Sequence, residues 1–239
     1  PFPGLLMRQP YGANIASTVV YAHPSWYAQQ GYLVLVLDVR GRGNSGGNFC
    51  GFATEATDGD DALAWLKQQP LCNGQIGCYG FSYQGLTQLL GSDSRLRPNA
   101  LAPAMCGLDE RLHWASEGQA HWWVLSLTWG LQLAAESCRR RGDQQAWQAI
   151  KDCLSSAQQS RHGLEMLRQH DPSNPVLQWL LSDPSHAVGW KRHQPSPERL
   201  RQPMQLLEGW CDPYLRGGLD LWQQSLQCGG SPELIIGPW

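Results

Sequence analysis

The sequence predicts an α/β fold in which helices cover a mostly parallel sheet and a helical segment is inserted between two of its strands. Residues 33–37 form a continuous apolar run, Leu-Val-Leu-Val-Leu, without polar alternation. This pattern is typical of a parallel strand that is buried on both faces. Strand-like and helix-like segments alternate up to about residue 107, whereas buried strand runs are absent from 108–202. We therefore predict a core in two parts, 1–107 and 203–239, with a helical insertion at 108–202.

The first core part consists of repeated strand and helix segments. The expected strands are 5–7, 33–37, 76–79 and 100–105, and the expected helices are 24–30, 58–68 and 86–90. Glycine and proline residues separate these segments, as they do in strand–helix connections. In the helix at 58–68, we expect Leu63, Leu66 and the Trp65 ring to lie on one side.

The middle of the chain has a helical pattern instead. Trp, Leu and Ala recur at helical spacing over 115–140 and 143–168, which predicts two helices. Five prolines interrupt the segment from residue 172 to residue 197. The strand pattern resumes at 204–207 and at 233–236, so we expect these two segments to rejoin the sheet.

The most informative motif is the hexapeptide Gly80-Phe81-Ser82-Tyr83-Gln84-Gly85, between a strand-like and a helix-like run. A serine at a sharp strand-to-helix turn between glycines is the nucleophile elbow of α/β-hydrolases. The turn strains the serine backbone and lifts the hydroxyl clear of the sheet. The second glycine usually follows the serine by two residues, but here Gln84 is in that position. The alternative is that Ser82 caps the helix that begins at Tyr83, because serine is a preferred N-cap residue.

A glycine-rich stretch follows the strand at 33–37. Gly41, Gly43 and Gly46 do not fit the dinucleotide-binding fingerprint, and no Walker lysine follows them. We therefore interpret the stretch as a tight loop on the side of the active site. Arg40 and Arg42 are expected to support this loop by pairing with carboxylates such as Asp58.

Motifs spread along the chain carry a family resemblance. They are Arg8-Gln9-Pro10-Tyr11-Gly12, the stretch 38–46, Asp58-Gly59 followed by Trp65, the elbow with Tyr83, Gly209-Trp210-Cys211-Asp212 and Ile236-Gly237-Pro238-Trp239. In this order, they resemble the X-Pro dipeptidyl-peptidase and cocaine-esterase-like family of α/β-hydrolases, which includes α-amino-acid ester hydrolases. The shifted glycine of the elbow is the family's own. The resemblance implies an α/β-hydrolase fold, with the insertion as a cap over the active site and with segments missing at both ends.

The resemblance also implies roles for particular residues. Ser82 is expected to attack the substrate carbonyl and form an acyl-enzyme. The Tyr83 backbone N–H and the Tyr11 phenol O–H are expected to stabilise the oxyanion. Asp212 is expected to orient a histidine. On chemistry alone, Tyr11 would be a turn tyrosine packed beside Pro10, and Asp212 would form an Asx turn or cap a helix.

The general base is absent from its expected place. All seven histidines precede Asp212, whereas the chain order of the fold puts the histidine after the last strand. The resemblance puts it just after Gly237-Pro238-Trp239, so we expect a fragment that ends before its base. Such a fragment should be nearly inactive, because removing a catalytic histidine costs on the order of 10⁶ in kcat. The alternative is an internal substitute among His23, His113 and His121.

The composition argues against several classes of partner. The formal net charge of −2 gives no basis for binding nucleic acid or an anionic membrane. No apolar run approaches the about 18 residues that a membrane span needs. The eight cysteines form no C-x-x-C pair, so we expect neither a zinc ribbon nor a redox motif, and we favour the cytoplasm. We expect no metal and no cofactor, and the oligomeric state is left open.

The predicted function is a serine hydrolase that acts on a small-molecule ester, an amide or a short peptide, including X-Pro dipeptides. X-Pro peptidase activity would require carboxylates, such as Asp109 and Glu110, to bind a free N-terminal ammonium. The alternative, from a different class, is a non-catalytic binding module that has kept the fold.

Overall fold

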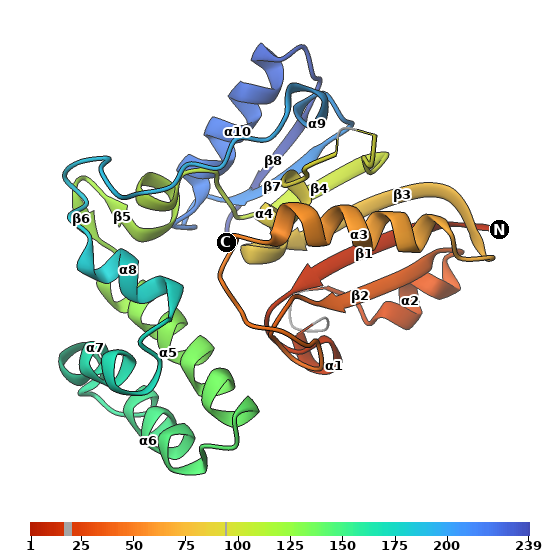
Figure 1. The fold of residues 1–239 in the computed structure, drawn as a ribbon. Coiled ribbons are helices and arrows are strands. Elements are labelled where there is room, and N and C mark those ends of the chain that lie inside the picture. Colours follow the sequence, from red (N-terminus) through yellow and green to blue (C-terminus); the bar gives the residue numbers. More distant parts are fainter. Residues whose placement is uncertain (17–20, 94) are drawn as a thin grey trace. The chain divides into compact units, whose positions relative to one another are not determined.

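The computed structural model describes residues 1–16, 21–93 and 95–239 and contains a six-stranded sheet (Figure 1). Its strands are β1 (Phe2–Gln9), β2 (Leu33–Asp38), β3 (Cys72–Phe81), β4 (Ala100–Ala104), β7 (Gln205–Gly209) and β8 (Glu233–Gly237). Their order across the sheet is β2-β1-β3-β4-β7-β8, and each pair of neighbours runs parallel. The predicted parallel sheet is confirmed.

Helices connect the strands of this sheet. They are α1 (Ala13–Ala16), α2 (Pro24–Gln29), α3 (Glu55–Lys67), α4 (Tyr83–Leu89), α9 (Pro197–Leu200) and α10 (Leu215–Gln227). The chain passes outward from β1 to β2 through α2 and returns past β1 to β3 through α3 (Figure 1). Because such crossovers are right-handed, connections in opposite directions put their helices on opposite faces. Within the described residues, no helix has the length and apolar character that a bilayer span requires.

The chain divides into two compact units, residues 1–108 with 193–239 and residues 109–192. The six-stranded sheet belongs to the first unit. Residues 193–202, which the sequence pattern assigns to the insertion at 108–202, group with the first unit. The buried side chain of Arg199 gives the reason, because its guanidinium donates to the Gln88 and Leu96 carbonyl oxygens at 3.2 and 3.4 Å.

The second unit contains a π-helical turn, a short hairpin and four helices. They are η1 (Glu110–Ala115), β5 (Ser116–Glu117), β6 (Ala120–His121), α5 (Trp123–Arg140), α6 (Gln144–Leu154), α7 (Gln159–His170) and α8 (Pro175–Leu181). The prediction of one helix over 115–140 is wrong at its start, because Gly118 and Gln119 turn the chain with φ of 56° and 68°. The expected helix at 143–168 is interrupted near Ser156, whose hydroxyl donates to the Cys153 carbonyl oxygen at 3.0 Å. Serine competes for backbone hydrogen bonds in this way at helix ends.

Helix α3 packs on the sheet through fewer side chains than expected. Leu63 and Leu66 are buried, at 2% and 1% exposure, because residues three apart share a helix face. Trp65 is 54% exposed, so it does not share their burial in the core. Adjacent positions on a helix point about 100° apart, so the indole of Trp65 is rotated from Leu66 toward β2, where it remains half exposed beside Leu35 and Leu37.

Glycine at position 85 allows α4 to lie close against β4. A Cβ atom there would lie 2.9 Å from Cys106 Sγ and 3.0 Å from the Ala104 carbonyl oxygen. Gln84 is also buried, and its side-chain oxygen accepts a hydrogen bond from the Phe81 N–H at 3.3 Å. The elbow therefore needs its glycine at 85, where helix and strand approach each other.

We predict that Gly85→Ala lowers the free energy of unfolding by about 1–3 kcal/mol, the usual cost of forcing an extra atom into a packed core. Gly46→Ala is the matched control, because a Cβ there meets no atom within 4 Å and its φ lies outside the left-handed region. Denaturant unfolding of both variants measures the difference. Equal unfolding midpoints would contradict the close approach of α4.

Candidate active site

The four residues singled out from the sequence all follow carboxyl ends of strands in the first unit. Tyr11 comes after β1, Ser82 and Tyr83 come directly after β3, and Asp212 comes after β7. Parallel strands end at the same edge of a sheet, and functional loops of α/β proteins gather there. The fold thus brings these residues to one edge.

Ser82 has a backbone conformation that side-chain-bearing residues rarely adopt, with φ 56° and ψ −123°. The tight turn is held by hydrogen bonds from the Ser82 N–H to the Ala104 carbonyl oxygen and from the Gly85 N–H to the Ser82 carbonyl oxygen, both 2.9 Å. A non-glycine residue in such a region costs about 1–3 kcal/mol. Although Ser82 is at the N-cap position of α4, its side chain makes no capping hydrogen bond. The helix-cap alternative therefore does not explain this serine.

Tyr214 links Ser82 to Asp212. Its backbone N–H donates to Asp212 Oδ1 at 2.9 Å, and its side chain hydrogen-bonds Ser82. Burial raises the pKa of the Tyr214 phenol, so the group is neutral at physiological pH. Ser82 and Asp212 thus lie at opposite ends of one tyrosine. Tyr214 was not predicted from the sequence, where its place two residues after Asp212 was the only available signal.

The Asp212 carboxyl is partly withdrawn from water. Burial raises its pKa, whereas hydrogen bonds from the Tyr214 N–H and from Glu208 lower it. No histidine of the described chain is among the groups that act on this carboxyl. Glu208, on β7, is completely buried and was also missed, because nothing in the sequence distinguishes it from an exposed strand residue.

The Tyr83 side chain anchors the start of α4 in the core. Its ring is fully buried and stacks on Phe52 with 4.4 Å between ring centroids. The phenol oxygen lies 2.8 Å from both the Gly51 carbonyl oxygen and Glu55 Oε1. Burial raises the pKa of this phenol, and the charge of Glu55 raises it further. These contacts fix the residue whose backbone N–H follows the elbow serine.

Glu55 also binds Arg8 in a buried ion pair. Arg8 Nη1 lies 2.9 Å from Glu55 Oε2 and 2.7 Å from the Glu55 carbonyl oxygen, and Nη2 donates to the Thr87 carbonyl oxygen. The side chains of Arg8 and Glu55 are 5% and 1% exposed. Burial raises the pKa of Glu55, and the nearby Arg8 and the Tyr83 hydroxyl oppose this effect. Through these contacts, the pair connects β1 with α3 and with α4, the helix that follows the elbow.

The Tyr11 loop is held by polar side chains from β1 and the loop after β2. The Tyr11 N–H donates to Gln9 Oε1 at 2.9 Å, and the Gln9 amide donates to Asp38 Oδ1 at 2.9 Å. Arg42 Nε donates to the Pro10 carbonyl oxygen at 3.1 Å. The Tyr11 phenol interacts electrostatically with the phenols of Tyr83 and Tyr214, so the three lie near one another.

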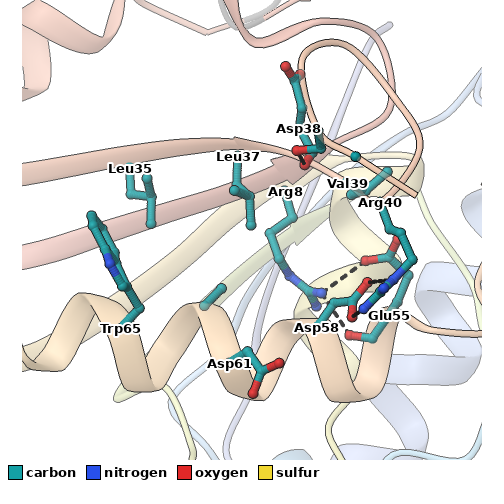
Figure 2. A pocket seen from close by; sticks show the side chains of 13 residues that line it. Arg8, Leu35, Leu37, Asp38, Val39, Arg40, Glu55, Asp58, Asp61 and Trp65 are labelled. Atoms are coloured by element: carbon teal, nitrogen blue, oxygen red, sulfur yellow. Dashed lines mark hydrogen bonds and ion pairs between the residues drawn. The ribbon is translucent and has the colours of Figure 1, made fainter. Parts of the chain in front are cut away.

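A cavity of about 450 Å³ lies between β2 and α3 in the first unit (Figure 2). Figure 2 shows two ion pairs at one end, Arg8 with Glu55 and Arg40 with Asp58, and Trp65 farther along α3 on the side of Leu35. The expected pairing of Arg40 with Asp58 is present, at 2.5 Å. None of the four expected site residues lines this cavity, so we do not assign it to the reaction.

The histidines considered as substitutes have other contacts. His23 caps α2 by accepting from the Ser25 N–H at 3.2 Å. In the second unit, His113 Nδ1 accepts from the Asp109 N–H at 3.1 Å, and His121 Nε2 lies 3.0 Å from the Ser182 carbonyl oxygen. Among the described residues, no group of three or more His, Cys, Asp or Glu side chains is arranged to hold a metal ion.

Comparison with known proteins gives consistent matches. A family model described as X-Pro dipeptidyl-peptidase (S15 family) matches residues 1–239. Cocaine esterase from Rhodococcus sp. (strain MB1 Bresler) is 25% identical over 259 residues, which cover 100% of this chain and 44% of that protein. The chain therefore spans less than half the length of this curated relative.

Solved structures support the fold. A CocE/NonD family hydrolase from Staphylococcus aureus matches with a TM-score of 0.67 at 17% identity, covering 99% of this chain and 41% of that one. An esterase from Pyrococcus furiosus matches with a TM-score of 0.58 at 14% identity, covering 100% of this chain and 72% of that one. The chain has the α/β-hydrolase fold.

We predict that Ser82→Gly unfolds at higher denaturant concentration than Ser82→Ala. Glycine relieves the strain at φ 56°, worth about 1–3 kcal/mol, whereas alanine retains it. Both variants lack the hydroxyl, so the comparison isolates the backbone. An alanine variant as stable as the glycine variant would show that the turn is not strained.

We predict that Glu55→Ala lowers the free energy of unfolding by about 3–5 kcal/mol, because it leaves the buried Arg8 guanidinium without its partner. Asp58→Ala is the matched control on the same helix, since its partner Arg40 is 50% exposed. Calorimetry of both variants measures the difference. A loss for Asp58→Ala equal to that for Glu55→Ala would contradict the role given to burial.

Proposed function

Because the chain belongs to the X-Pro dipeptidyl-peptidase (S15) family, we propose that it forms the catalytic core of a serine hydrolase that cleaves esters or amides. The observation that carries this proposal is the strained backbone of Ser82 in the turn between β3 and α4. A serine occupies a position where glycine would fit with less strain. The two residues differ by a CH₂OH group, whose hydroxyl supplies a nucleophile.

In the proposed reaction, Ser82 Oγ attacks the substrate carbonyl carbon while its proton passes to a general base. The carbonyl oxygen becomes an oxyanion, which accepts hydrogen bonds from the Tyr83 backbone N–H and the Tyr11 hydroxyl. Each such donor stabilises the transition state by about 2.7–4 kcal/mol. The leaving group takes the proton and departs, and water then hydrolyses the acyl-Ser82 ester by the same steps.

The proposed general base is a histidine that directly follows Trp239 in a longer protein, oriented by Asp212. Two hydrogen bonds support this position. The Cys211 N–H donates to the Trp239 carbonyl oxygen at 3.0 Å, and the Trp210 N–H donates to the Gly237 carbonyl oxygen at 3.0 Å. A residue attached to Trp239 would therefore begin beside the loop that carries Asp212.

Small carboxylic esters are proposed as the preferred substrates, ahead of X-Pro peptides. Asp109 and Glu110, the carboxylates considered for an N-terminal ammonium, have partners within the second unit. Asp109 Oδ1 accepts from the Arg111 and Leu112 N–H groups at 3.0 and 2.9 Å, and Glu110 Oε2 accepts from Trp179 Nε1 at 2.9 Å. A curated relative is itself named an esterase.

We predict that the natural sequence extended past Trp239 is labelled by an alkyl fluorophosphonate, and that Ser82→Ala abolishes labelling because the nucleophile is gone. Mass spectrometry locates the adduct. The chain ending at Trp239 should turn over esters on the order of 10⁶ more slowly, the cost of a missing triad histidine. Equal labelling of the extended protein and its Ser82→Ala variant would exclude the proposed nucleophile and favour a binding module.

We predict that Tyr11→Phe in the extended protein lowers kcat by about 10²–10³, as the loss of one oxyanion donor does. The KM should change little, because the donor acts on charge that develops only in the transition state. Tyr32→Phe is the control, since Tyr32 is an exposed tyrosine that precedes β2. An unchanged kcat for Tyr11→Phe would remove Tyr11 from the mechanism.

A further inference from the structure

Glu208 is a carboxylic acid at a core position of β7. Side chains alternate between the two faces of a strand, and Leu206 and Glu208 on one face are both 0% exposed, whereas Gln205 is exposed. Glutamate is almost never fully buried unless it is paired. A partner therefore has to be identified for this side chain.

The residues around Glu208 leave space for its carboxyl group. Helix α10 presents Gly218 to it, and a Cβ atom at that position would lie 2.1 Å from Glu208 Oε1. Any other residue at 218 would displace the carboxyl. The Met105 N–H is near Glu208, but it already donates to the Leu207 carbonyl oxygen at 3.0 Å.

Glu208 and Asp212 are partners of each other. Their side chains hydrogen-bond, yet Oε1 and Oε2 of Glu208 and Oδ2 of Asp212 are buried and find no N–H or hydroxyl donor among the described residues. Two ionised carboxylates only accept hydrogen bonds, so a bond between them requires a proton on one. Glu208 is more deeply buried than Asp212, which makes it the group that holds the proton.

We propose that Glu208 is a protonated carboxylic acid whose O–H donates to Asp212 and fixes the orientation of that carboxylate. This role rests on the proposed function, in which Asp212 orients the catalytic histidine. Asp212 Oδ1 already accepts from the Tyr214 N–H at 2.9 Å, so the two donors would hold both of its oxygens. Each oxygen keeps a further lone pair for the histidine. Glu208 is thus a positioning residue.

The charges around Glu208 agree with this protonation state. Burial raises the pKa of Glu208 to about 9, and the negative charge of Asp212 and the hydrogen bond with it also raise the pKa, whereas the Met105 backbone N–H has a smaller, lowering effect. Burial raises the pKa of the Cys106 thiol, after β4, and the charges of Glu208 and Asp212 also raise it. No cationic side chain of the described chain contributes to the pKa of Glu208. The proton is therefore present at neutral pH and is lost as the pH rises through about 9.

The test uses the extended protein with three variants. Glu208→Gln keeps a neutral donor, Glu208→Leu keeps volume without a donor, and Glu233→Gln changes an exposed glutamate on β8. At neutral pH, we expect kcat to be retained in Glu208→Gln and Glu233→Gln. In Glu208→Leu, kcat should fall about tenfold or more with little change in KM, the rate equivalent of one lost hydrogen bond.

The pH profile distinguishes positioning from packing. The wild-type kcat should decline as the pH rises through about 9, and this alkaline decline should be absent in Glu208→Gln, which has no proton to lose. An unchanged kcat in a folded Glu208→Leu variant, or an alkaline decline that persists in Glu208→Gln, would overturn the proposal.

A titration separates this proposal from the proposed function. The ¹³C NMR signal of the Glu208 carboxyl, assigned by its absence in Glu208→Gln, should titrate with a midpoint near 9. A midpoint near the ordinary glutamate value of about 4.3 would overturn the proposal even if Ser82 is the nucleophile. Failure of Ser82 labelling would instead overturn the proposed function. The titration remains informative in that case, because it requires neither catalytic activity nor a folded Glu208→Leu variant.

Discussion

The strained turn between β3 and α4 is the constraint on which the site depends. Ser82 adopts φ 56° because Gly85 allows α4 to pack against Cys106 and Ala104, which leaves the connecting chain no room to relax. The conformation costs free energy, and the surrounding contacts offset that cost. The same turn decides where the serine hydroxyl and the following N–H point, so fold stability and the proposed chemistry share one structural origin.

A buried network of polar side chains stabilises this turn. The Tyr83 hydroxyl, Glu55 and Arg8 connect α4, α3 and β1, and each is almost completely withdrawn from water. Removing one member of such a network leaves a buried charge without a partner. This destabilises the fold more than replacing the whole ion pair by apolar residues does. A second pair of carboxyl groups, the buried Glu208 and the partly buried Asp212, lies within and just after β7. The site thus has polar supports on two neighbouring parts of the sheet.

The sequence was sufficient to predict the parallel sheet and to place Tyr11, Ser82, Tyr83 and Asp212 after the ends of its strands. The unbroken apolar run at 33–37 correctly predicted a parallel strand, but not its burial on both faces, because β2 is the edge strand and residues 33–37 are only partly buried. The elbow and Asp212 each come shortly after a strand, as expected. The sequence was insufficient where the backbone conformation of a segment or the burial of a side chain depends on residues that are distant along the chain. Gly118 and Gln119 form a hairpin turn inside a helix-like pattern, and Trp65 differs from Leu66 only by its direction on α3. Glu208 resembles an ordinary exposed glutamate until Gly218 and Asp212 are placed beside it.

The central claim is that Ser82 is the nucleophile of an oxyanion-stabilising site formed by Tyr11, after β1, and Tyr83, at the start of α4. A crystal structure of the extended protein after reaction with a fluorophosphonate tests it most directly. We expect phosphorus bonded to Ser82 Oγ, with one phosphonyl oxygen within hydrogen-bond distance of the Tyr83 backbone nitrogen and the Tyr11 hydroxyl. An adduct on another residue, or a phosphonyl oxygen directed away from both donors, would contradict the account.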